Sequence, residues 1–459
     1  MRSIVAALVL LVAVRAHAQD ADARRYLPNR ADEDWTFLRD APRIDAWDGL
    51  KYIALRDRDD WFMTLSGEVR YRPEGFRIRE TSAQPSTIDN YLLQRYLFGA
   101  DVRLGSRARV FGELQSGIIN GSLRSPRPTD RNTLDVHQAF FEWRQNAGQN
   151  RLSVRAGRQE VAIGSTRLIS ASPGLNVKRS FDGVATVFRA PSFTLVGAAA
   201  RLVGLGSGVF DDWQDSGQLF WGVGVGRRSP RFQRGELGAY YLGVDRDLSL
   251  YAQGAGREQR HTIGVKWTGA GARADLNYDA LFQWGTFAGG PIRAWAFATE
   301  TGYRLSTGGW RPRVHVRVDI ASGDRDLSNP RLEAFNPLFP GNSYSGAVGL
   351  LGPTNLTDFT PALTVRPHPS LTVGFEAPSY WRTSTTDGVY GTDLRLLIPP
   401  RAGEGKYVGT NPGVLVVWQA TRHWELQGAI TRFLTGGFLS NTFVSAGFGF
   451  YSASAIYRF

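Results

Sequence analysis

Polar and apolar residues alternate along many short stretches of this chain. In residues 311–320, every odd position from Arg311 to Asp319 is charged or polar, and every even position from Pro312 to Ile320 is apolar. Successive side chains of a β-strand leave opposite faces of the backbone, so a period of two predicts a strand with one polar and one apolar face. Such a strand suits either a soluble sandwich or a membrane barrel whose apolar side meets lipid.

The same alternation recurs along the chain and predicts about 18 strands, an even number as in bacterial single-chain barrels. Charged side chains share one face in the clearest segments, as Glu68 and Arg70 do in 64–72, and Arg95 and Arg103 in 95–104. The other predicted strands are 107–115, 134–144, 151–159, 183–188, 194–202, 218–225, 237–244, 262–267, 273–284, 294–305, 311–320, 362–366, 371–377, 415–421, 425–433 and 451–459.

The two ends of the chain favour the membrane barrel. The first residues combine Arg2, an apolar run from Ile4 to Val14 and small residues at 16 and 18, which predicts a signal peptide at 1–18. No later stretch has the roughly 18 to 20 apolar residues of a spanning helix, so only a closed barrel would satisfy the backbone in lipid. The last strand ends in Phe459, as closing strands of outer-membrane barrels do.

These observations predict an all-β fold, a transmembrane antiparallel up-and-down β-barrel at 61–459 in the bacterial outer membrane. The charged N-terminal segment at 19–60 is expected either to extend into the periplasm or to enter the lumen. Short turns are expected at Gly105-Ser106 and at 269–271, and long extracellular loops at 81–90, 120–133, 161–178 and 324–358. Loops of that length often fold back and narrow a pore.

Composition agrees with a barrel and adds a chemical indication. The chain has 52 glycines, 12% aromatic residues and no cysteine, and its formal net charge is +12. Lysine occurs only at positions 51, 178, 266 and 406, so nearly all of the 54 basic residues are arginine, which binds carboxylates through paired hydrogen bonds. Each arginine has an alternative role, pairing with carboxylates across strands. The surplus of arginine instead favours anion attraction inside the barrel.

Other chemistries receive little support. The basic residues are dispersed along strand faces and are not clustered with stacking aromatics, which argues against nucleic-acid binding. The histidines show no metal-ligand spacing, and nucleophile-elbow and phosphate-loop motifs are absent from the sequence. A barrel enzyme using His315 is the third alternative and is not favoured, so we expect no catalysis, no cofactor and no metal.

Several sequence blocks together resemble the alginate export family of outer-membrane barrels. The resemblance runs from about residue 50 to Phe459. The blocks are LSGEVRYRPEGF, LQRYLFGADVRLGSRARVFGELQSG, VHQAFFEW, RAGRQEVAIGSTRLI, RSFDGV, DIASGDRD, FNPLFP, LLGPTNLTDFTPALTVRP and WQATRHWEL.

The resemblance implies an 18-stranded barrel with an arginine-rich conduit for polyuronate, narrowed by a long extracellular loop and a periplasmic one. The GRQE block implies roles for Arg155, Arg158 and Gln159, and the RSFDGV block for Arg179 and Asp182. The GDRD block adds Arg325, with Asp324 and Asp326 as its expected partners. Periodicity, independently of the family, places further side chains on the conduit wall, namely Arg70, Arg95, Arg103, Arg313, Arg317 and Asp319.

The resulting hypothesis is a passive, anion-selective conduit that exports an acidic exopolysaccharide, an alginate-like polyuronate. Its expected partners are the polymer, outer-membrane lipid and periplasmic secretion proteins. We expect a monomer, although the sequence does not exclude a trimer. The alternative is a general diffusion porin for small anions or oligosaccharides, and the sequence leaves the solute and the direction of transport undecided.

Overall fold

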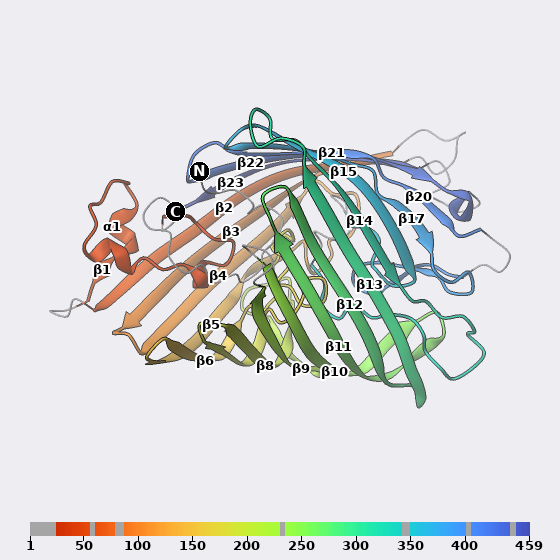
Figure 1. Cartoon of the computed structure of the whole chain (residues 1–459), viewed down its shortest axis with the longest axis horizontal. Coiled ribbons are helices and arrows are strands. Elements are labelled where there is room, and N and C mark those ends of the chain that lie inside the picture. Colours follow the sequence, from red (N-terminus) through yellow and green to blue (C-terminus); the bar gives the residue numbers. More distant parts are fainter. Residues whose placement is uncertain are drawn as a thin grey trace.

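The computed structural model describes residues 24–55, 60–78, 87–229, 235–341, 349–400, 405–440 and 447–459, so the predicted signal peptide lies outside the described residues. Long tilted strands form a closed barrel (Figure 1). Closure is explicit in the pairing, because β2 (Trp61–Ile78) pairs with both β3 (Thr87–Leu104) and β23 (Phe448–Arg458). Among the described residues, every helix is too short or too polar to cross a membrane.

The wall has 18 strand positions, and neighbouring strands are antiparallel. Each of the strands predicted from alternation lies in one of these positions, which confirms the predicted architecture. After β3 the wall continues through β4 (Ala108–Asn120), β5 (Asn132–Ala147), β6 (Asn150–Gln159), β7 (Phe181–Arg189), β8 (Phe193–Gly204), β9 (Trp213–Ser229), β10 (Gly235–Tyr251), β11 (Gly254–Ala270), β12 (Ala274–Phe287), β13 (Gly290–Arg304), β14 (Arg313–Ala321), β15 (Leu356–His368) and, later, β22 (Trp424–Thr435).

Two positions of the wall are each shared by two short strands. One position holds β16 (Leu371–Glu376) and β17 (Ser379–Arg382), and the next holds β20 (Tyr407–Thr410) and β21 (Gly413–Gln419). The breaks contain Pro378 and Pro412, which have no backbone N–H to donate to the sheet. The wall nevertheless stays joined there, because Asn411 N donates to Pro378 O at 2.8 Å.

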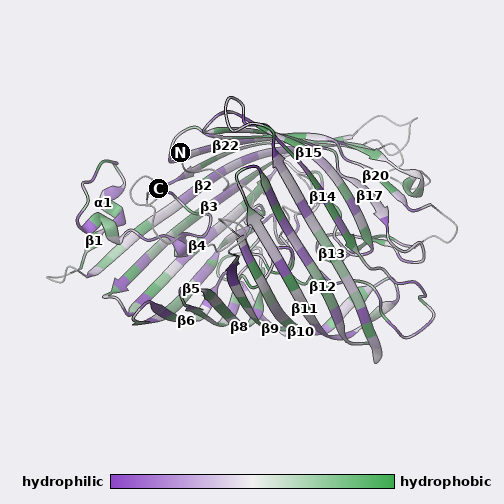
Figure 2. Ribbon diagram, in the orientation of Figure 1, coloured by the Kyte–Doolittle hydropathy of each residue, from purple (hydrophilic) through white to green (hydrophobic). Residues whose placement is uncertain are grey.

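The two faces of the wall differ as the alternation predicts. Glu68 and Arg95 point inward and are 1% and 3% exposed, whereas Phe98, on the opposite face of β3, is 51% exposed. On β14, Val314 and Val316 point outward, on the face opposite to Arg317. Figure 2 shows the resulting mixture of polar and apolar stripes along the strands. The outward apolar face is the one that meets lipid in a membrane barrel.

The C-terminus lies at the same end of the barrel as the turns after β3, β5, β7, β11 and β13, here called the turn end. The opposite end, which carries the long loops and the two-residue turns after β10 and β12, is the loop end. Two long loops at the loop end fold into the lumen. They are residues 160–180 and the described parts of residues 322–355, namely 322–341 and 349–355. Their apolar side chains pack together against the inner wall, and the two loops are joined by a bridge between Ile169 and Phe339. The loop end also carries the small strands β18 (Val389–Tyr390) and β19 (Leu396–Ile398) and the helix η4 (Gly437–Leu439).

The N-terminal segment docks at the turn end, beside the C-terminus (Figure 1). It contains η1 (Arg30–Asp32), η2 (Thr36–Arg39), α1 (Asp48–Lys51) and β1 (Ile53–Ala54), and β1 pairs with β2. Its aromatic side chains form a cluster with Phe62 of the wall, made of Tyr26, Trp35, Leu38 and Tyr52. Of the two expectations for this segment, the structure therefore supports entry into the barrel.

Candidate functional site

The lumenal arginines of β2 and β3 hold the tip of the loop 160–180. Arg95 donates through Nε to Glu68 at 2.9 Å and through Nη1 to the carbonyl oxygens of Pro173 and Leu175, both at 2.8 Å. Arg70 donates to Gly174 O at 3.2 Å and Leu175 O at 2.8 Å. Arg70 is therefore satisfied by neutral oxygens, without an ion pair among the described residues.

The lumenal arginines of β14 are paired with carboxylates of neighbouring strands. Arg313 donates through Nε to Asp275 at 3.1 Å and through Nη2 to Glu300 at 2.9 Å. Arg317 donates through Nη2 to Asp358 at 2.8 Å, and its Nε lies 3.7 Å from Asp319. These residues lie on the lumenal wall as predicted, but cross-strand pairing neutralises their charge.

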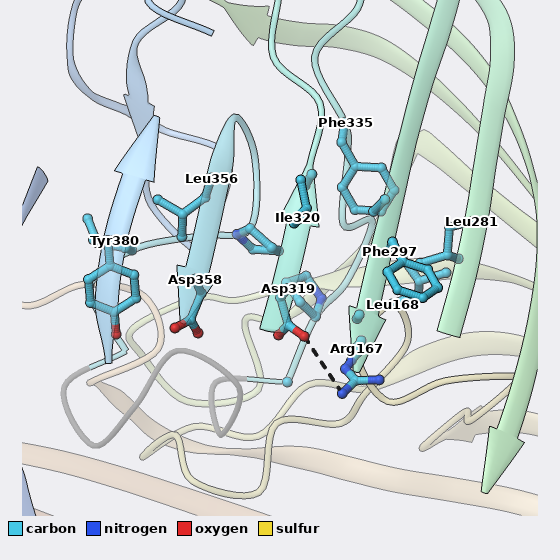
Figure 3. Close-up of a pocket in the computed structure, with 17 residues that line it drawn as sticks. Arg167, Leu168, Leu281, Phe297, Asp319, Ile320, Phe335, Leu356, Asp358 and Tyr380 are labelled. Atoms are coloured by element: carbon cyan, nitrogen blue, oxygen red, sulfur yellow. Dashed lines mark ion pairs between the residues drawn. The ribbon is translucent and has the colours of Figure 1, made fainter. Parts of the chain in front are cut away.

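A small cavity lies beside these pairs, between the wall and the inward-folded loops (Figure 3). Its lining is mostly apolar, with contributions from Leu168, Phe335 and Leu356. Its polar side contains Asp319 and Asp358, and Arg167 faces Asp319 at 4.0 Å (Figure 3). Arg167 is also paired with Asp279 at 2.6 Å. The carboxylates beside the cavity therefore have arginine partners, and the surface of the cavity itself is largely apolar.

Two guanidinium groups without ion pairs among the described residues lie where the inward-folded loops meet. Arg179 donates through Nη1 to Ser170 O at 3.0 Å and to Pro340 O at 3.3 Å, and Arg246 donates through Nη2 to Leu338 O at 2.9 Å. Both lie near the ring of Phe339, at 5.8 and 5.0 Å from its centroid. Burial and the charge of Arg246 lower the pKa of Arg179 to about 10, so it stays charged at neutral pH.

Arg246 was not among the predicted site residues. It lies on the lumenal face of β10, opposite Glu258, but the register shifts directly after it. That irregularity ended the visible alternation at residue 244. The signal was nevertheless in the sequence, because Arg246 continues the inward face of Tyr240, Leu242 and Val244.

Arg158 and Asp182 are not in the lumen. Arg158 donates through Nε to Asp182 at 2.8 Å, and the pair lies across from Ala139 on one side and Arg201 on the other. Asp182 shares its strand face with Val184, which is 46% exposed. The structure therefore places this pair on the outer face of the barrel near the loop end, and not in the conduit that the motif implied. The neighbouring Gln159 does point inward and is 1% exposed.

Arg325 also differs from the prediction. Its side chain is 75% exposed in the loop 322–355, and its partner is Glu333, at 2.8 Å from Nε. The pairing with Asp324 or Asp326 expected from the GDRD block is therefore wrong. Asp324 instead points into the loop, where burial raises its pKa to about 6. Arg325 lies at the mouth of the barrel and not on its inner wall.

The turn end of the lumen is narrowed by the N-terminal segment. Arg103 donates through Nη1 to Asp34 at 2.8 Å, and Arg155 pairs with Glu142 at 2.6 Å and lies 3.6 Å from Asp32. The resemblance implied a periplasmic loop in this role. Among the turns that the structure describes at this end, the one at 305–312 is long, and its Trp310 is 64% exposed, so it packs little against the rest of the barrel.

Docking of the N-terminal segment is expected to strengthen as pH rises. The ammonium of Lys51 is fully buried and donates to Leu65 O at 2.7 Å, and burial lowers its pKa to about 7. In the undocked segment, Lys51 keeps its proton up to the ordinary lysine pKa of about 10.4. Between about pH 7 and about pH 10.4 the undocked state therefore binds more protons than the docked state. Raising the pH through this range stabilises the docked state.

The chain has no cysteine, so a fluorophore at Ile44→Cys, a position that is 72% exposed, reports on docking. Its anisotropy should increase from pH 7 to pH 9, and Lys51→Met should remove the change. An unchanged pH profile in Lys51→Met would assign the effect to another group.

One group of carboxylates in the described residues has the spacing of a metal site. Oxygen atoms of Asp135, Asp211 and Asp212 lie within 4.8 Å of one another. Backbone and amide donors already satisfy them, because Asp212 accepts from Gly206 N at 2.7 Å and from Asn132 Nδ2 at 2.9 Å. Burial raises the pKa of Asp212 to about 6, which reduces the negative charge of the group below that pH. The cluster is explained without an ion.

The fold is shared with solved outer-membrane porins. A BenF-like porin from Pseudomonas fluorescens Pf-5 matches with a TM-score of 0.59 at 11% identity, covering 86% of this chain and 98% of the porin. OpdQ from Pseudomonas aeruginosa matches at 0.55 and 13% identity, covering 86% and 97%. OpdK from the same organism, in a structure with vanillate, matches at 0.55 and 12% identity, covering 86% and 98%. Identities this low support the shared fold alone.

The sequence itself gives the narrower assignment. No match was found among curated proteins. The model of the alginate export family matches residues 62–447, which is most of the chain and nearly the whole barrel. With a closed antiparallel barrel and porins as structural neighbours, this match indicates a channel of the bacterial outer membrane. The chain belongs to the alginate export family.

Proposed function

We propose that this protein is a passive, anion-selective conduit that exports an acidic polysaccharide of the polyuronate class. The observation that carries the proposal is the set of lumenal guanidinium groups without ion pairs among the described residues, Arg70, Arg179 and Arg246. Their charges lie on the inner wall or on loops inside it, where the field on a passing anion is strongest. Family membership supports the choice of an acidic polymer.

Magnitudes favour transit over capture. A solvent-exposed contact between a guanidinium and a carboxylate contributes only about 0.2 to 1 kcal/mol. A polyuronate has a carboxylate on every sugar, so it can exchange one contact for the next without releasing all of them. Most other lumenal arginines are already paired with Asp or Glu, which limits the total attraction. A conduit with a few free positive charges attracts the polymer but does not bind it tightly.

Conductance in planar bilayers tests the proposal. The wild-type channel should favour chloride over potassium, and the double variant Arg179→Gln/Arg246→Gln should lower that preference about tenfold because it removes two lumenal charges. A matched control removes two arginines of the outer face, Arg201→Gln/Arg257→Gln, and should leave the selectivity unchanged. Equal chloride and potassium permeability in the wild type would overturn anion selectivity.

The polymer itself separates the two candidate functions. Sodium alginate should reduce the current through the wild-type channel, and neutral dextran of the same length should not. The alternative, a diffusion porin for small anions, is favoured by the structural neighbour described with vanillate. It predicts block or permeation by small carboxylates and no specific effect of alginate.

A further inference from the structure

The N-terminal segment carries three consecutive carboxylates, and two of them, those of Asp32 and Asp34, lie against lumenal arginines. The carboxylate of Glu33 is instead bound within the segment, by Arg30 and by Trp35 Nε1. Arg103 of β3 donates to Asp34 Oδ1 at 2.8 Å and to Glu33 O at 2.7 Å. Arg155 of β6 lies 3.6 Å from Asp32. Two arginines assigned to the conduit therefore contact carboxylates of the chain's own N-terminal segment, in addition to the wall carboxylates Asp101 and Glu142.

The same segment reaches inside the barrel. Ala31 is 1% exposed and packs on Phe111 and Phe140, which point inward from β4 and β5. Asn29 Oδ1 accepts a hydrogen bond from Gln138 Nε2 at 3.1 Å. Residues 28–34 therefore occupy the lumen beside the first strands of the barrel.

The segment also touches a loop that enters from the opposite end. Pro28 O accepts a hydrogen bond from Lys178 Nζ at 3.1 Å, and Lys178 belongs to the loop 160–180. The ammonium of Lys178 is paired in turn with Glu160. Burial raises the pKa of Glu160, but the neighbouring Lys178 and His137 lower it further, and the net result is a pKa of about 2. The N-terminal segment and the inward-folded loop thus meet inside the barrel and obstruct the path along this wall.

The rest of the segment is attached differently. Trp47 stacks on Phe459 with 4.3 Å between ring centroids and donates through Nε1 to Tyr457 OH at 2.7 Å. His423, in the turn before β22, contacts Asp45 at 2.8 Å. Residues 45–54 are therefore anchored at the turn end by aromatic and polar contacts that need no lumenal arginine. Residues 28–34 can leave the lumen while this anchor stays in place.

We propose that residues 28–34 act as an internal polyanion that closes the conduit. The carboxylates of Asp34 and Asp32 lie against Arg103 and Arg155, the positions that a polyuronate entering from the turn end would reach first. The incoming polymer competes for these arginines and displaces the segment, so the conduit opens when its solute is present. The proposal rests on the proposed function, because it assumes that the solute is a polyanion.

Thiol accessibility tests the displacement. Ala31→Cys introduces the only cysteine of the full-length chain at a buried position. With the segment docked, a neutral maleimide should react slowly, and sodium alginate should speed labelling about tenfold, as a shift toward the undocked state requires. Neutral dextran should have no effect. Labelling that is fast without polymer, or that alginate leaves unchanged, would overturn the proposal.

Charge removal supplies an independent test. The double variant Asp32→Asn/Asp34→Asn, combined with Ala31→Cys, should speed labelling of the introduced thiol without polymer and raise the resting conductance. Asp40→Asn is the matched control in the same segment, because its side chain is 76% exposed, and it should behave as the wild type. Retained heat-modifiability on gels confirms that each variant forms a barrel.

The two proposals fail in different ways. If the channel is anion-selective and blocked by alginate, but the double variant changes neither labelling nor resting conductance, the proposed function stands and the internal polyanion is rejected. A channel that lacks anion selectivity and does not respond to alginate removes both.

Discussion

Glu258→Ala should lower the free energy of unfolding by about 3 to 5 kcal/mol, as loss of one partner of a buried ion pair does. Glu258 and Arg260 are both fully buried on the lumenal face of β11 and are paired with each other. The substitution leaves the guanidinium of Arg260 with neutral acceptors, Gln283 Oε1 at 2.7 Å and Ala334 O at 3.2 Å. A buried charge without a counter-charge is what makes the loss large.

The same substitution should loosen the loop 322–355. Asn336 of this loop donates through Nδ2 to Glu258 at 3.0 Å and to Tyr251 OH at 2.9 Å. Urea unfolding in detergent, followed by loss of the heat-modifiable band, measures the stability, and proteolysis of the loop measures its release. Asp245→Ala is the control, because it breaks the exposed pair with Arg257 and should change little. Equal effects of the two substitutions would mean that Glu258 is well hydrated.

Val316→Arg should destabilise the barrel in lipid by about 2 to 4 kcal/mol, the cost of an arginine on the lipid face near the bilayer midplane. Val316 lies near the middle of β14 and is 38% exposed on the outer face. His315 is its neighbour on the same strand and faces the lumen between Arg313 and Arg317. His315→Arg introduces the same side chain one residue away, and it should cost far less because the lumenal face is polar.

Unfolding in lipid vesicles compares the two variants directly. The difference should shrink when detergent replaces lipid. If His315→Arg destabilises the barrel as much as Val316→Arg, the assignment of the two faces is wrong.

The success at β14 has a simple origin. Which face a strand residue occupies is decided by a period of two, and that period is visible in a few consecutive residues. The sequence therefore predicts both the strand and the direction of Arg313, Arg317 and Val316 without knowledge of any neighbour. The same reasoning placed Arg70 and Arg95 in the lumen, where the structure has them.

The placement of Arg158 in the conduit was wrong because it followed a family motif and not the two-residue period of a strand. Arg155 and Arg158 are three positions apart on one strand, so they lie on opposite faces. A family motif carried both into the conduit together, whereas the pairing of β6 with β5 and β7 puts Arg155 inside and Arg158 outside. Attention to spacing alone would have separated the two residues.

Sequence by itself determined the strands, their two faces, the closed barrel and the excess of positive charge, because all of these depend on local periodicity and composition. Tertiary structure alone decided which arginines keep a free charge. Arg179 and Arg317 are both lumenal arginines in the sequence, yet Arg317 has Asp358 beside it and Arg179 has backbone oxygens. That difference depends on which strands are neighbours and on how loops more than a hundred residues apart meet inside the barrel, and no local pattern encodes either.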